Sequence, residues 1–384
     1  MKVAIIAGFA PSILNFRKAL ILELVKQAEV AVFAPFEDEV TTQAILSLGV
    51  SYYFTEFRAT ALNPIRDLKA LRQLTRQLNA FQPDYLLSYT IKAVIWGSLA
   101  AHKTGVRAIY AMITGLGYAF TDLSNLKRKL IHKIVVLLYR YSLRHSQIVF
   151  FQNPDDLVLF QQLNIIPSTK NTAILNGSGV DLDYYAASIP VLFPLRFLMV
   201  ARLLKDKGIN EYLQAAEQVK LLHPTVEFHL VGWIDDNPST ISSALLQTYI
   251  NKKIIIFHGK LVDVRPVLAM SSVFVLPSYR EGTPRSVLEA MSTGRAVITT
   301  DAPGCKETVR DHYNGYLVPV NNVRALVQAM LKFVENPALI TQMGFASRAL
   351  AEEKYDVRQV NQVILSVMGL YAADEYQPVQ KELT

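Results

Sequence analysis

The sequence predicts an α/β protein with two Rossmann-like, doubly wound domains that face each other across a cleft. Short apolar stretches of strand character alternate with amphipathic helical patterns, which is typical of a parallel sheet wrapped by helices. The strand stretches are apolar along almost their whole length, as expected where both faces of a sheet are covered. At 384 residues the chain exceeds one ordinary hydrophobic core and suffices for two domains.

The first half begins with an expected strand at residues 3–7 and an amphipathic helix at residues 16–27. Further strands are expected at residues 30–34, 85–88, 108–112 and 148–151. The pattern then stops at a segment rich in glycine and proline, residues 176–194, and restarts beyond it.

The second half repeats the same alternation. Strands are expected at residues 197–200, 227–231, 254–257, 273–276 and 296–299, with a loop and a helix up to about residue 220 after the first of them. We therefore divide the chain into a first domain (1–178), a linker (179–194), a second domain (195–365) and a C-terminal tail (366–384). Ligands of such folds bind at the carboxyl ends of the strands, which places the expected site in the cleft.

The composition is that of a globular, reduced, non-spanning protein. Hydrophobic residues make up 51% and charged residues 18%, which argues against disorder. Cys305 is the single cysteine and excludes both an internal disulfide and a cysteine-rich zinc site. The apolar opening, residues 1–8, is too short for a signal segment, and no apolar run reaches the length of a membrane span. We expect a cytoplasmic protein whose net charge of +7 favours anionic partners.

Two glutamates stand in the most informative segment, residues 273–294, which reads VFVLPSYREGTPRSVLEAMSTG. A strand ends at Pro277, a polar loop follows, and a helix is expected to start near Pro284 with Thr283 as its N-cap. Glu281 then lies in the loop and Glu289 about a turn and a half into the helix. The helix start also offers free N–H groups to a phosphate. Each glutamate by itself would equally suit a solvated carboxylate near a helix start.

This segment resembles the signature of the retaining family-4 glycosyltransferases, E-G-x-P-x-x-x-L-E-A-M-x-x-G. The matching positions are Glu281, Gly282, Pro284, Leu288, Glu289, Ala290, Met291 and Gly294. The resemblance implies the two-domain GT-B fold and a nucleotide-diphosphate sugar as donor. It also implies that Glu281 contacts the donor sugar and Glu289 the ribose hydroxyls, beside Gly282, Thr283 and Pro284. A front-face reaction with retention, in which the donor phosphate helps to deprotonate the acceptor, is the family's usual chemistry, and Glu281 is not assigned as a nucleophile.

Residues 200–208, VARLLKDKG, resemble the family's loop that carries an arginine and a lysine for the donor diphosphate. Arg202 and Lys207 fall on those positions, and fixed cations there would stabilise the charge that gathers on the leaving diphosphate. The loop by itself would be taken as exposed and basic. His258 matches a turn near the nucleotide base, and a structural histidine remains the alternative. Residues 301–307 and 314–319 match the family further along the chain.

Asp181 and Asp183 spell a D-x-D pattern that binds metal in another glycosyltransferase fold. Here the pattern lies in the linker and looks like the family's hinge segment, where Asp181 is expected to hydrogen-bond locally. We expect no metal site and no cofactor, because the nucleotide sugar is a substrate.

The first domain is expected to bind the acceptor. Gly8 and Ser12, in the loop after the first strand, are candidates for approaching the donor phosphates, with an ordinary turn as the alternative. Residues 113–120, ITGLGYAF, resemble a segment of a bacterial subgroup. The histidine that many family members have near this point is absent, and Thr114 or the backbone of Gly115 and Gly117 would replace it.

The subgroup that the chain resembles adds hexose or N-acetylhexosamine units to polyprenyl-diphosphate-linked sugars. Its motifs are matched at residues 57–60, 62–64 and 232–239. We therefore expect a UDP-sugar donor, a lipid-linked sugar acceptor and a role in surface polysaccharide or glycan assembly.

Residues 126–144, LKRKLIHKIVVLLYRYSLR, combine apolar residues at helical spacing with several basic residues and no acid. The basic residues include Lys127, Arg128, Lys129 and Lys133. Such a helix could lie on an anionic membrane surface, which here would be the inner face of the plasma membrane. A core-packing helix with a solvated basic face is the alternative.

Three other functions are each compatible with part of the sequence. A soluble sugar or polysaccharide acceptor keeps the fold and the donor. A UDP-sugar 2-epimerase shares the fold, but the two-glutamate signature speaks against it. Nucleic-acid binding fits the net charge, but the chain has no recognisable nucleic-acid-binding motif.

Overall fold

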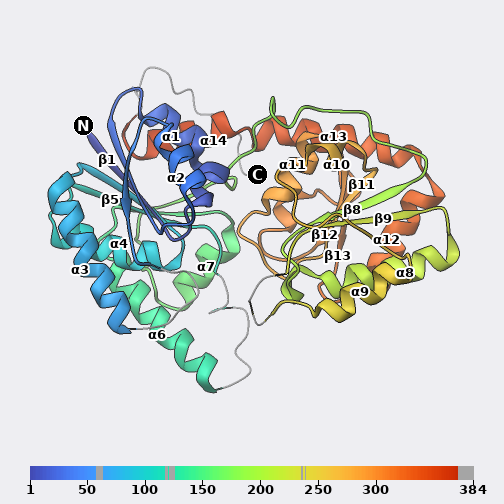
Figure 1. Cartoon of the computed structure of the whole chain (residues 1–384), viewed down its shortest axis with the longest axis horizontal. Coiled ribbons are helices and arrows are strands. Elements are labelled where there is room, and N and C mark those ends of the chain that lie inside the picture. Colours follow the sequence, from blue (N-terminus) through green and yellow to red (C-terminus); the bar gives the residue numbers. More distant parts are fainter. Residues whose placement is uncertain (58–63, 117–119, 121–125, 235–236, 238, 371–384) are drawn as a thin grey trace. The chain divides into compact units, whose positions relative to one another are not determined.

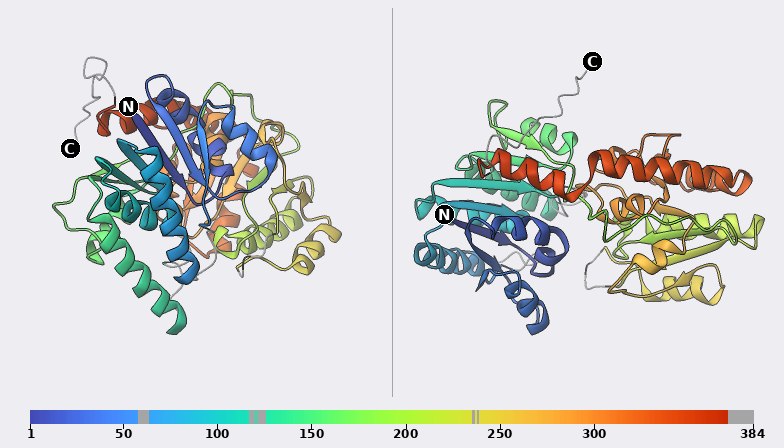
Figure 2. Two further views of the ribbon diagram at one scale, coloured as in Figure 1. Left: turned by 60° about the vertical axis from the view of Figure 1, so that its left-hand side comes forward. Right: turned by 90° about the horizontal axis from the view of Figure 1, so that it is seen from above.

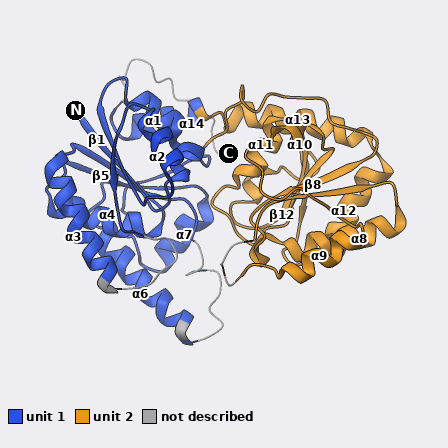
Figure 3. Ribbon diagram, in the orientation of Figure 1, with its two compact units in different colours: residues 1–178, 358–384 blue, residues 179–357 orange. Residues whose placement is uncertain are grey.

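The computed structural model describes the chain except residues 58–63, 117–119, 121–125, 235–236, 238 and 371–384 (Figure 1). It forms two compact units (Figure 3). The first comprises Met1–Ser178 and the chain from Arg358 onward, and the second comprises Gly179–Val357. Both units are parallel α/β sandwiches, which confirms the predicted fold class.

The first unit contains a seven-stranded sheet in the order β3-β2-β1-β4-β5-β6-β7, with all neighbouring strands parallel. The strands are β1 (Lys2–Ala7), β2 (Glu29–Ala34), β3 (Ser51–Phe54), β4 (Tyr85–Tyr89), β5 (Ala108–Ile113), β6 (Ile148–Phe151) and β7 (Thr172–Ile174). The two edge strands, β3 and β7, were not predicted. Their residues are half-buried or exposed, so they lack the continuous apolar run of the inner strands.

Alternating residues of β1 enter two separate cores. Ala4 and Ile6 belong to one buried cluster, and Val3, Ile5 and Ala7 to the other. The helices of this unit are η1 (Ile13–Arg17), α1 (Lys18–Leu24), α2 (Glu39–Leu46), α3 (Pro64–Phe81), α4 (Ile91–Lys103), α6 (Leu126–Leu143), α7 (Pro154–Gln162) and α14 (Val357–Val367). Side chains of α3, α4, α6 and α7 fill the first cluster, and those of α1, α2 and α14 fill the second.

The C-terminal helix corrects our domain boundary. We assigned residues up to 365 to the second domain, but Val360, Ile364 and Leu365 pack in the core of the first unit beside Val3 and Ile5. Tyr110 of β5 donates a hydrogen bond to the carbonyl oxygen of Met368 at 3.1 Å. The amphipathic pattern of this helix indicated that it packs on a core and did not indicate which one.

The second unit contains a six-stranded parallel sheet in the order β10-β9-β8-β11-β12-β13. The strands are β8 (Arg196–Val200), β9 (Glu227–Val231), β10 (Ile256–Phe257), β11 (Val273–Leu276), β12 (Ala296–Thr300) and β13 (Gly315–Val318). The helices are η2 (Lys205–Lys207), α8 (Ile209–Leu222), α9 (Ser243–Asn251), α10 (Arg265–Ala269), α11 (Arg285–Ser292), η3 (Lys306–Thr308), α12 (Val323–Glu335) and α13 (Ala338–Lys354).

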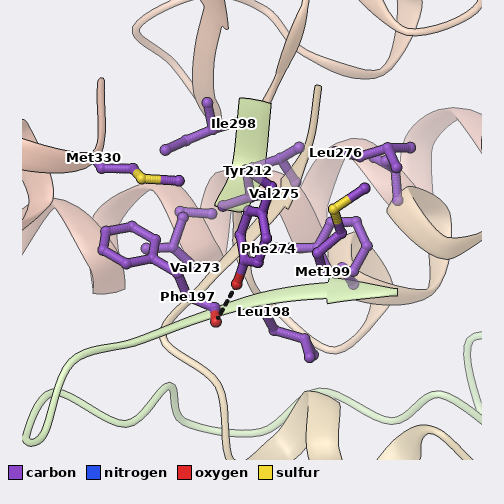
Figure 4. Close-up of a cluster of buried hydrophobic side chains, with 14 of the residues drawn as sticks. Phe197, Leu198, Met199, Tyr212, Val273, Phe274, Val275, Leu276, Ile298 and Met330 are labelled. Atoms are coloured by element: carbon purple, nitrogen blue, oxygen red, sulfur yellow. Dashed lines mark hydrogen bonds between the residues drawn. The ribbon is translucent and has the colours of Figure 1, made fainter. Parts of the chain in front are cut away.

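Helices cover both faces of this sheet as well. The pair α8 and α12 packs together on one face, and the pair α11 and α13 on the other (Figures 1 and 2). The strands between them are nearly fully buried, and the hydroxyl of Tyr212 on α8 donates to the carbonyl oxygen of Phe197 at 2.9 Å (Figure 4). The buried hydroxyl of Tyr212 thus has a hydrogen-bond acceptor, which a polar group shielded from water requires.

The expected linker, residues 179–194, belongs to the second unit. Val180 is fully buried in the core of this unit, and its N–H donates to the carbonyl oxygen of Tyr355 at 2.7 Å. Val357 returns a hydrogen bond to the carbonyl oxygen of Val180 at 3.0 Å. The start of the segment is therefore fixed to the chain at residues 355–357 through both the N–H and the carbonyl group of Val180.

In the part of the chain that the structure describes, the helices are too short or too polar to cross a membrane.

The placement of α14 leads to a stability prediction. Ile364→Ala removes a fully buried side chain from the second buried cluster of the first unit. It should lower the unfolding free energy of that unit by about 3 kcal/mol. The two tryptophans report the two units separately, because Trp96 lies in α4 and Trp233 follows β9. Urea unfolding of a Trp233→Phe background should show the loss through Trp96. The exposed Gln362→Ala is the control. In a Trp96→Phe background Trp233 reports the second unit, and a loss seen only there would assign α14 to the second unit.

Candidate active site

Glu281 and Lys207 form an ion pair at the carboxyl ends of two neighbouring strands. Lys207 lies in η2 after β8, and Glu281 lies in the loop after β11. The Lys207 Nζ and Glu281 Oε1 atoms are 2.5 Å apart, and the two side chains are 16% and 14% exposed. Water screens such a pair less than it would a surface pair. The structure therefore brings together two of the three predicted catalytic residues.

Backbone contacts hold these two loops together. The N–H of Tyr279 donates to the carbonyl oxygen of Asp206 at 2.8 Å, and the hydroxyl of Ser278 donates to the same oxygen at 3.1 Å. The hydroxyl of Tyr279 donates to Glu211 Oε1 at 2.7 Å. The position of Lys207 relative to Glu281 is thus set by several bonds beyond the ion pair.

Two glycines allow the close approach. Gly208 has a φ of 75°, and a Cβ there would lie 2.1 Å from the carbonyl oxygen of Pro277. Gly304 has a φ of 81°, and a Cβ there would lie 2.2 Å from the carbonyl oxygen of Glu281. No other residue type fits these two positions without moving the backbone.

Glu289 is held by a second cation. Arg285 Nε lies 3.1 Å from Glu289 Oε1, and Arg285 Nη1 donates to the carbonyl oxygen of Gly179 at 2.6 Å. Burial raises the pKa of Glu289, and Arg285 together with a hydrogen bond from Tyr185 opposes this shift. Sequence reasoning missed Arg285 and Tyr185. The i,i+4 spacing of Arg285 and Glu289 was the available signal for the first, whereas Tyr185 lies far away in the sequence.

The start of α11 differs slightly from the prediction. The helix begins at Arg285, and Pro284 occupies the N-cap position with φ −71° and ψ 108°. The N-cap residue is therefore Pro284, whose side chain makes no capping hydrogen bond, and not Thr283 as we expected. Gly282 and Pro284 are buried and Thr283 is half-buried in the loop beside Glu281.

Cys305 lies behind this loop. It is fully buried, and burial raises the pKa of its thiol to about 12, with a further contribution from Glu281. A thiol with such a pKa is neutral near pH 7 and is not a nucleophile. The residue therefore packs behind the site and does no chemistry there.

His258 follows β10 and belongs to a chain of polar groups that leads to the amino ends of β9 and β8, away from Lys207 and Glu281. Its Nε2 lies 2.9 Å from Nδ1 of His229, whose Nε2 lies 3.2 Å from Glu227 Oε2. Arg196 Nε donates to the same carboxylate oxygen at 2.8 Å. Burial lowers the pKa of both histidines, which favours their neutral forms near pH 7. The structural alternative for His258 gains support, and His229 was not predicted.

Arg202 lies two residues beyond β8 and is exposed. It shares the carboxyl edge of the sheet with Lys207. Its role at the donor diphosphate stays a prediction.

In the first unit, the loop after β1 is tied down locally. The N–H of Gly8 donates to Thr90 Oγ1 at 3.1 Å, and the hydroxyl of Ser12 donates to the carbonyl oxygen of Phe9 at 2.5 Å. Ser12 is 4% exposed and its hydroxyl also lies 3.0 Å from that of Tyr89. These contacts support the turn alternative for both residues. Thr114 follows β5 and is half-buried. Gly117 and the parts of the subgroup motifs at residues 58–63, 235–236 and 238 lie outside the described residues.

Asp181 makes the local hydrogen bonds that we predicted. Its Oδ1 accepts from the N–H groups of Asp183 at 3.1 Å and Tyr184 at 2.9 Å. This turn accounts for the D-x-D pattern without a metal ion.

The basic helix, α6, has two apolar faces. Val135, Tyr139 and Leu143 are buried in the core of the first unit. A second row remains exposed at spacings of three and four residues: Leu126, Leu130, Ile134, Leu137 and Tyr141. We call this row the exposed apolar stripe. The exposed side chains of Lys129 and Lys133 lie on the same helix, Arg128 is half-buried, and the side chain of Lys127 is outside the described set.

Comparison with known proteins places both halves of the chain. Residues 194–350 match the family of glycosyl transferases group 1, and residues 17–177 match the glycosyl transferase 4-like domain. The N,N'-diacetylbacillosaminyl-diphospho-undecaprenol alpha-1,3-N-acetylgalactosaminyltransferase of Campylobacter jejuni is 28% identical over 383 residues, which cover 96% of this chain and 98% of that protein. The UDP-Gal:alpha-D-GlcNAc-diphosphoundecaprenol alpha-1,3-galactosyltransferase of Escherichia coli is 27% identical over 306 residues, 76% of each chain.

Two solved structures share the fold at low identity. HepE of Anabaena, solved in complex with UDP, has a TM-score of 0.75 at 17% identity and covers 97% of this chain and 100% of its own. Sucrose-phosphate synthase of Thermosynechococcus elongatus has a TM-score of 0.77 at 17% identity, with coverage of 96% and 98%.

The glycines beside Lys207 lead to a prediction with a matched control. Gly208 and Gly259 both have positive φ, but only the Cβ of Gly208→Ala would collide with backbone, since nothing lies within 4 Å of a Cβ at Gly259. Gly259→Ala should cost about 1 kcal/mol from backbone strain. Gly208→Ala should cost at least about 3 kcal/mol, because the loops must also separate. Urea unfolding followed by Trp233 fluorescence measures both, and equal losses would contradict the close approach.

Proposed function

The chain is a glycosyltransferase of the GT-B fold, with a glycosyl transferase 4-like first domain and a second domain of glycosyl transferases group 1, and from this premise we propose its reaction. It moves a hexose or N-acetylhexosamine from a UDP-sugar to a polyprenyl-diphosphate-linked sugar, with retention of configuration. The names of the two relatives described above support this proposal, because both act on sugars linked to undecaprenyl diphosphate. The second of these relatives uses UDP-galactose.

The Lys207–Glu281 pair carries the donor half of the proposal. The leaving UDP gathers negative charge as the bond to the anomeric carbon breaks, so a fixed ammonium beside the diphosphate lowers the barrier. Lys207 supplies that charge, with Arg202 as a second, more exposed cation. In the structure Glu281 balances the charge of Lys207. When the diphosphate takes the lysine, the Glu281 carboxylate becomes free to accept hydrogen bonds from the donor sugar.

The proposed transfer occurs on one face of the donor sugar. The acceptor hydroxyl oxygen bonds to the anomeric carbon on the face that UDP leaves, and the proton of the hydroxyl passes to an oxygen of the departing diphosphate. No enzyme carboxylate forms a covalent intermediate in this scheme. Neither a metal ion nor a cofactor takes part, because the two cations meet the charge of the leaving group.

Glu289 fits the role of ribose ligand. A carboxylate can accept hydrogen bonds from two adjacent hydroxyls, and Arg285 with Tyr185 fixes its orientation. Arg285 also opposes the rise in the pKa of Glu289 that burial causes, and so favours the charged form, which accepts both bonds.

The exposed apolar stripe of α6 supports a membrane-linked acceptor. Leu130 and Leu137 are 60% and 59% exposed, beside the cations Lys129 and Lys133. We propose that this face lies on the anionic inner surface of the plasma membrane, where each basic residue contributes about 1 kcal/mol. The apolar side chains would enter the headgroup boundary, and the attachment would be peripheral.

Lys207→Ala tests the donor site. We expect kcat/KM for transfer to a short polyprenyl-diphosphate-linked sugar to fall by about a hundredfold or more, since a group that stabilises the transition state is removed. Lys205→Ala is the matched control, because Lys205 is exposed and lies in the same short helix. The assay uses a panel of UDP-hexoses and UDP-N-acetylhexosamines with EDTA present. Equal activity of the two variants would end the site assignment, and loss of wild-type activity in EDTA would refute the metal-free scheme.

Leu130→Asp combined with Ile134→Asp tests the membrane face. The two acids replace exposed apolar side chains and repel anionic lipid, so co-sedimentation with vesicles containing phosphatidylglycerol should be lost. Val262→Asp, at a fully exposed position of the second unit, is the control. If the double variant instead converts a dimer to a monomer and leaves vesicle binding intact, the stripe is a contact between two copies of the chain.

A further inference from the structure

A pocket of about 470 Å³ lies at the C-terminal end of α6. It is bounded by the last two turns of that helix and by the segment between α7 and β7. Its lining residues are Leu137, Arg140, Tyr141, Leu143, Arg144, Asn164, Ile165, Ile166, Pro167 and Lys170. The volume lies within the range of small-molecule sites. No role at the donor or acceptor site has been assigned to any of these residues.

The pocket combines three cations with an apolar floor. Arg140, Arg144 and Lys170 line it, and none of its lining residues, all of which the structure describes, is acidic. Ile165 and Ile166 are each 2% exposed and form part of the first unit's core. An anion with an apolar remainder matches this chemistry better than a neutral sugar or a free nucleotide does.

Neutral groups hold the three cations in place. Arg140 Nη2 donates to the carbonyl oxygen of Leu163 at 3.0 Å, and the Arg144 guanidinium lies 3.9 Å from the centre of the Tyr141 ring. Lys170 Nζ donates to the carbonyl oxygens of Ser146 and, at 3.4 Å, of Arg144. These contacts of the three cations involve carbonyl oxygens and rings, so their charge remains available to an external anion.

The pocket lies at the amino edge of the sheet. Arg144 precedes β6, and Lys170 precedes β7. Gly8 and Thr114 follow β1 and β5 and mark the opposite, carboxyl edge, where ligands of this fold react. The pocket is therefore separate from the acceptor site. The helix α6 lies between the carboxyl end of β5 and the amino end of β6, so the exposed apolar stripe runs from one edge of the sheet toward the other. The stripe reaches the pocket, because Leu137 and Tyr141 belong to both.

We propose that this pocket binds the headgroup of an anionic phospholipid of the membrane. The phosphate lies among Arg140, Arg144 and Lys170, and the glycerol and first acyl methylenes lie against Leu137 and Tyr141. Continuity with the stripe favours a membrane lipid over a soluble phosphate, because a lipid held there keeps its acyl chains at the same apolar face. The proposal deepens the membrane attachment proposed above and does not depend on the identity of the donor or acceptor sugar.

Binding of monomeric dihexanoyl phosphatidylglycerol, below its micelle concentration, tests the pocket. Calorimetry on the full chain should show saturable binding that Arg140→Gln combined with Arg144→Gln weakens by roughly tenfold or more. Lys129→Gln combined with Lys133→Gln removes the same charge from the same helix outside the pocket and should leave this binding unchanged. Equal weakening by the two pairs would reduce the pocket to general attraction and overturn the proposal.

Two further measurements distinguish a membrane lipid from a soluble anion, and a loss of binding from a loss of folding. Inorganic phosphate and glycerol phosphate should bind at least roughly tenfold more weakly than the lipid, since they lack the apolar part. Equal affinity would make the pocket a soluble-anion site. Leu137→Glu places an acid at a 59% exposed rim position without touching the core, and it should abolish lipid binding even if the arginine variants unfold.

Transferase assays keep this proposal distinct from the proposed function. Transfer to a short, soluble acceptor should be unchanged in the Arg140→Gln, Arg144→Gln variant, because the pocket lies at the other edge of the sheet. If no lipid-linked acceptor is used but phosphatidylglycerol still binds, the function fails and the pocket stands. If transfer occurs and the lipid does not bind, the reverse holds.

Discussion

The contact between Lys207 and Glu281 across two strand ends is the constraint on which the second unit's site depends. An ammonium and a carboxylate 2.5 Å apart require the loops after β8 and β11 to approach closely. Gly208 against the carbonyl of Pro277, and Gly304 against that of Glu281, make the approach sterically possible. A side chain at either position would collide with the backbone, so both positions require glycine.

The same pairing principle recurs at Glu289. Both glutamates expected at the donor are paired with a cation, Glu281 with Lys207 and Glu289 with Arg285. This arrangement limits the repulsion that two acids would exert on an incoming diphosphate. It also fixes carboxylates that would otherwise be costly to bury, and Arg285 adds a bond to Gly179, where the second unit begins.

In the first unit, the predicted ligand-binding residues and the cationic pocket lie at opposite edges of the sheet. Its carboxyl edge holds Gly8 and Thr114, whereas its amino edge holds the cationic pocket at the end of α6. The helix α6 is compatible with both interpretations of its sequence, a core-packing helix and a helix on a membrane surface. Tyr139 and Leu143 pack in the core, and Leu130 and Leu137 are exposed on another side. A helix with apolar residues on two sides can anchor to the fold and to a membrane at once.

The sequence by itself determined the two-domain α/β class, the inner strands, and the residues Lys207, Glu281 and Glu289. Those features depend on local pattern or on short spacing, which is visible in one dimension. Tertiary structure decided that α14 packs with the first unit, that Arg285 and Tyr185 support Glu289, and that Ser12 serves its own turn. These contacts join residues far apart in the chain or choose between equivalent apolar faces. A periodic pattern shows that a face is apolar, and only the packed fold decides what that face meets.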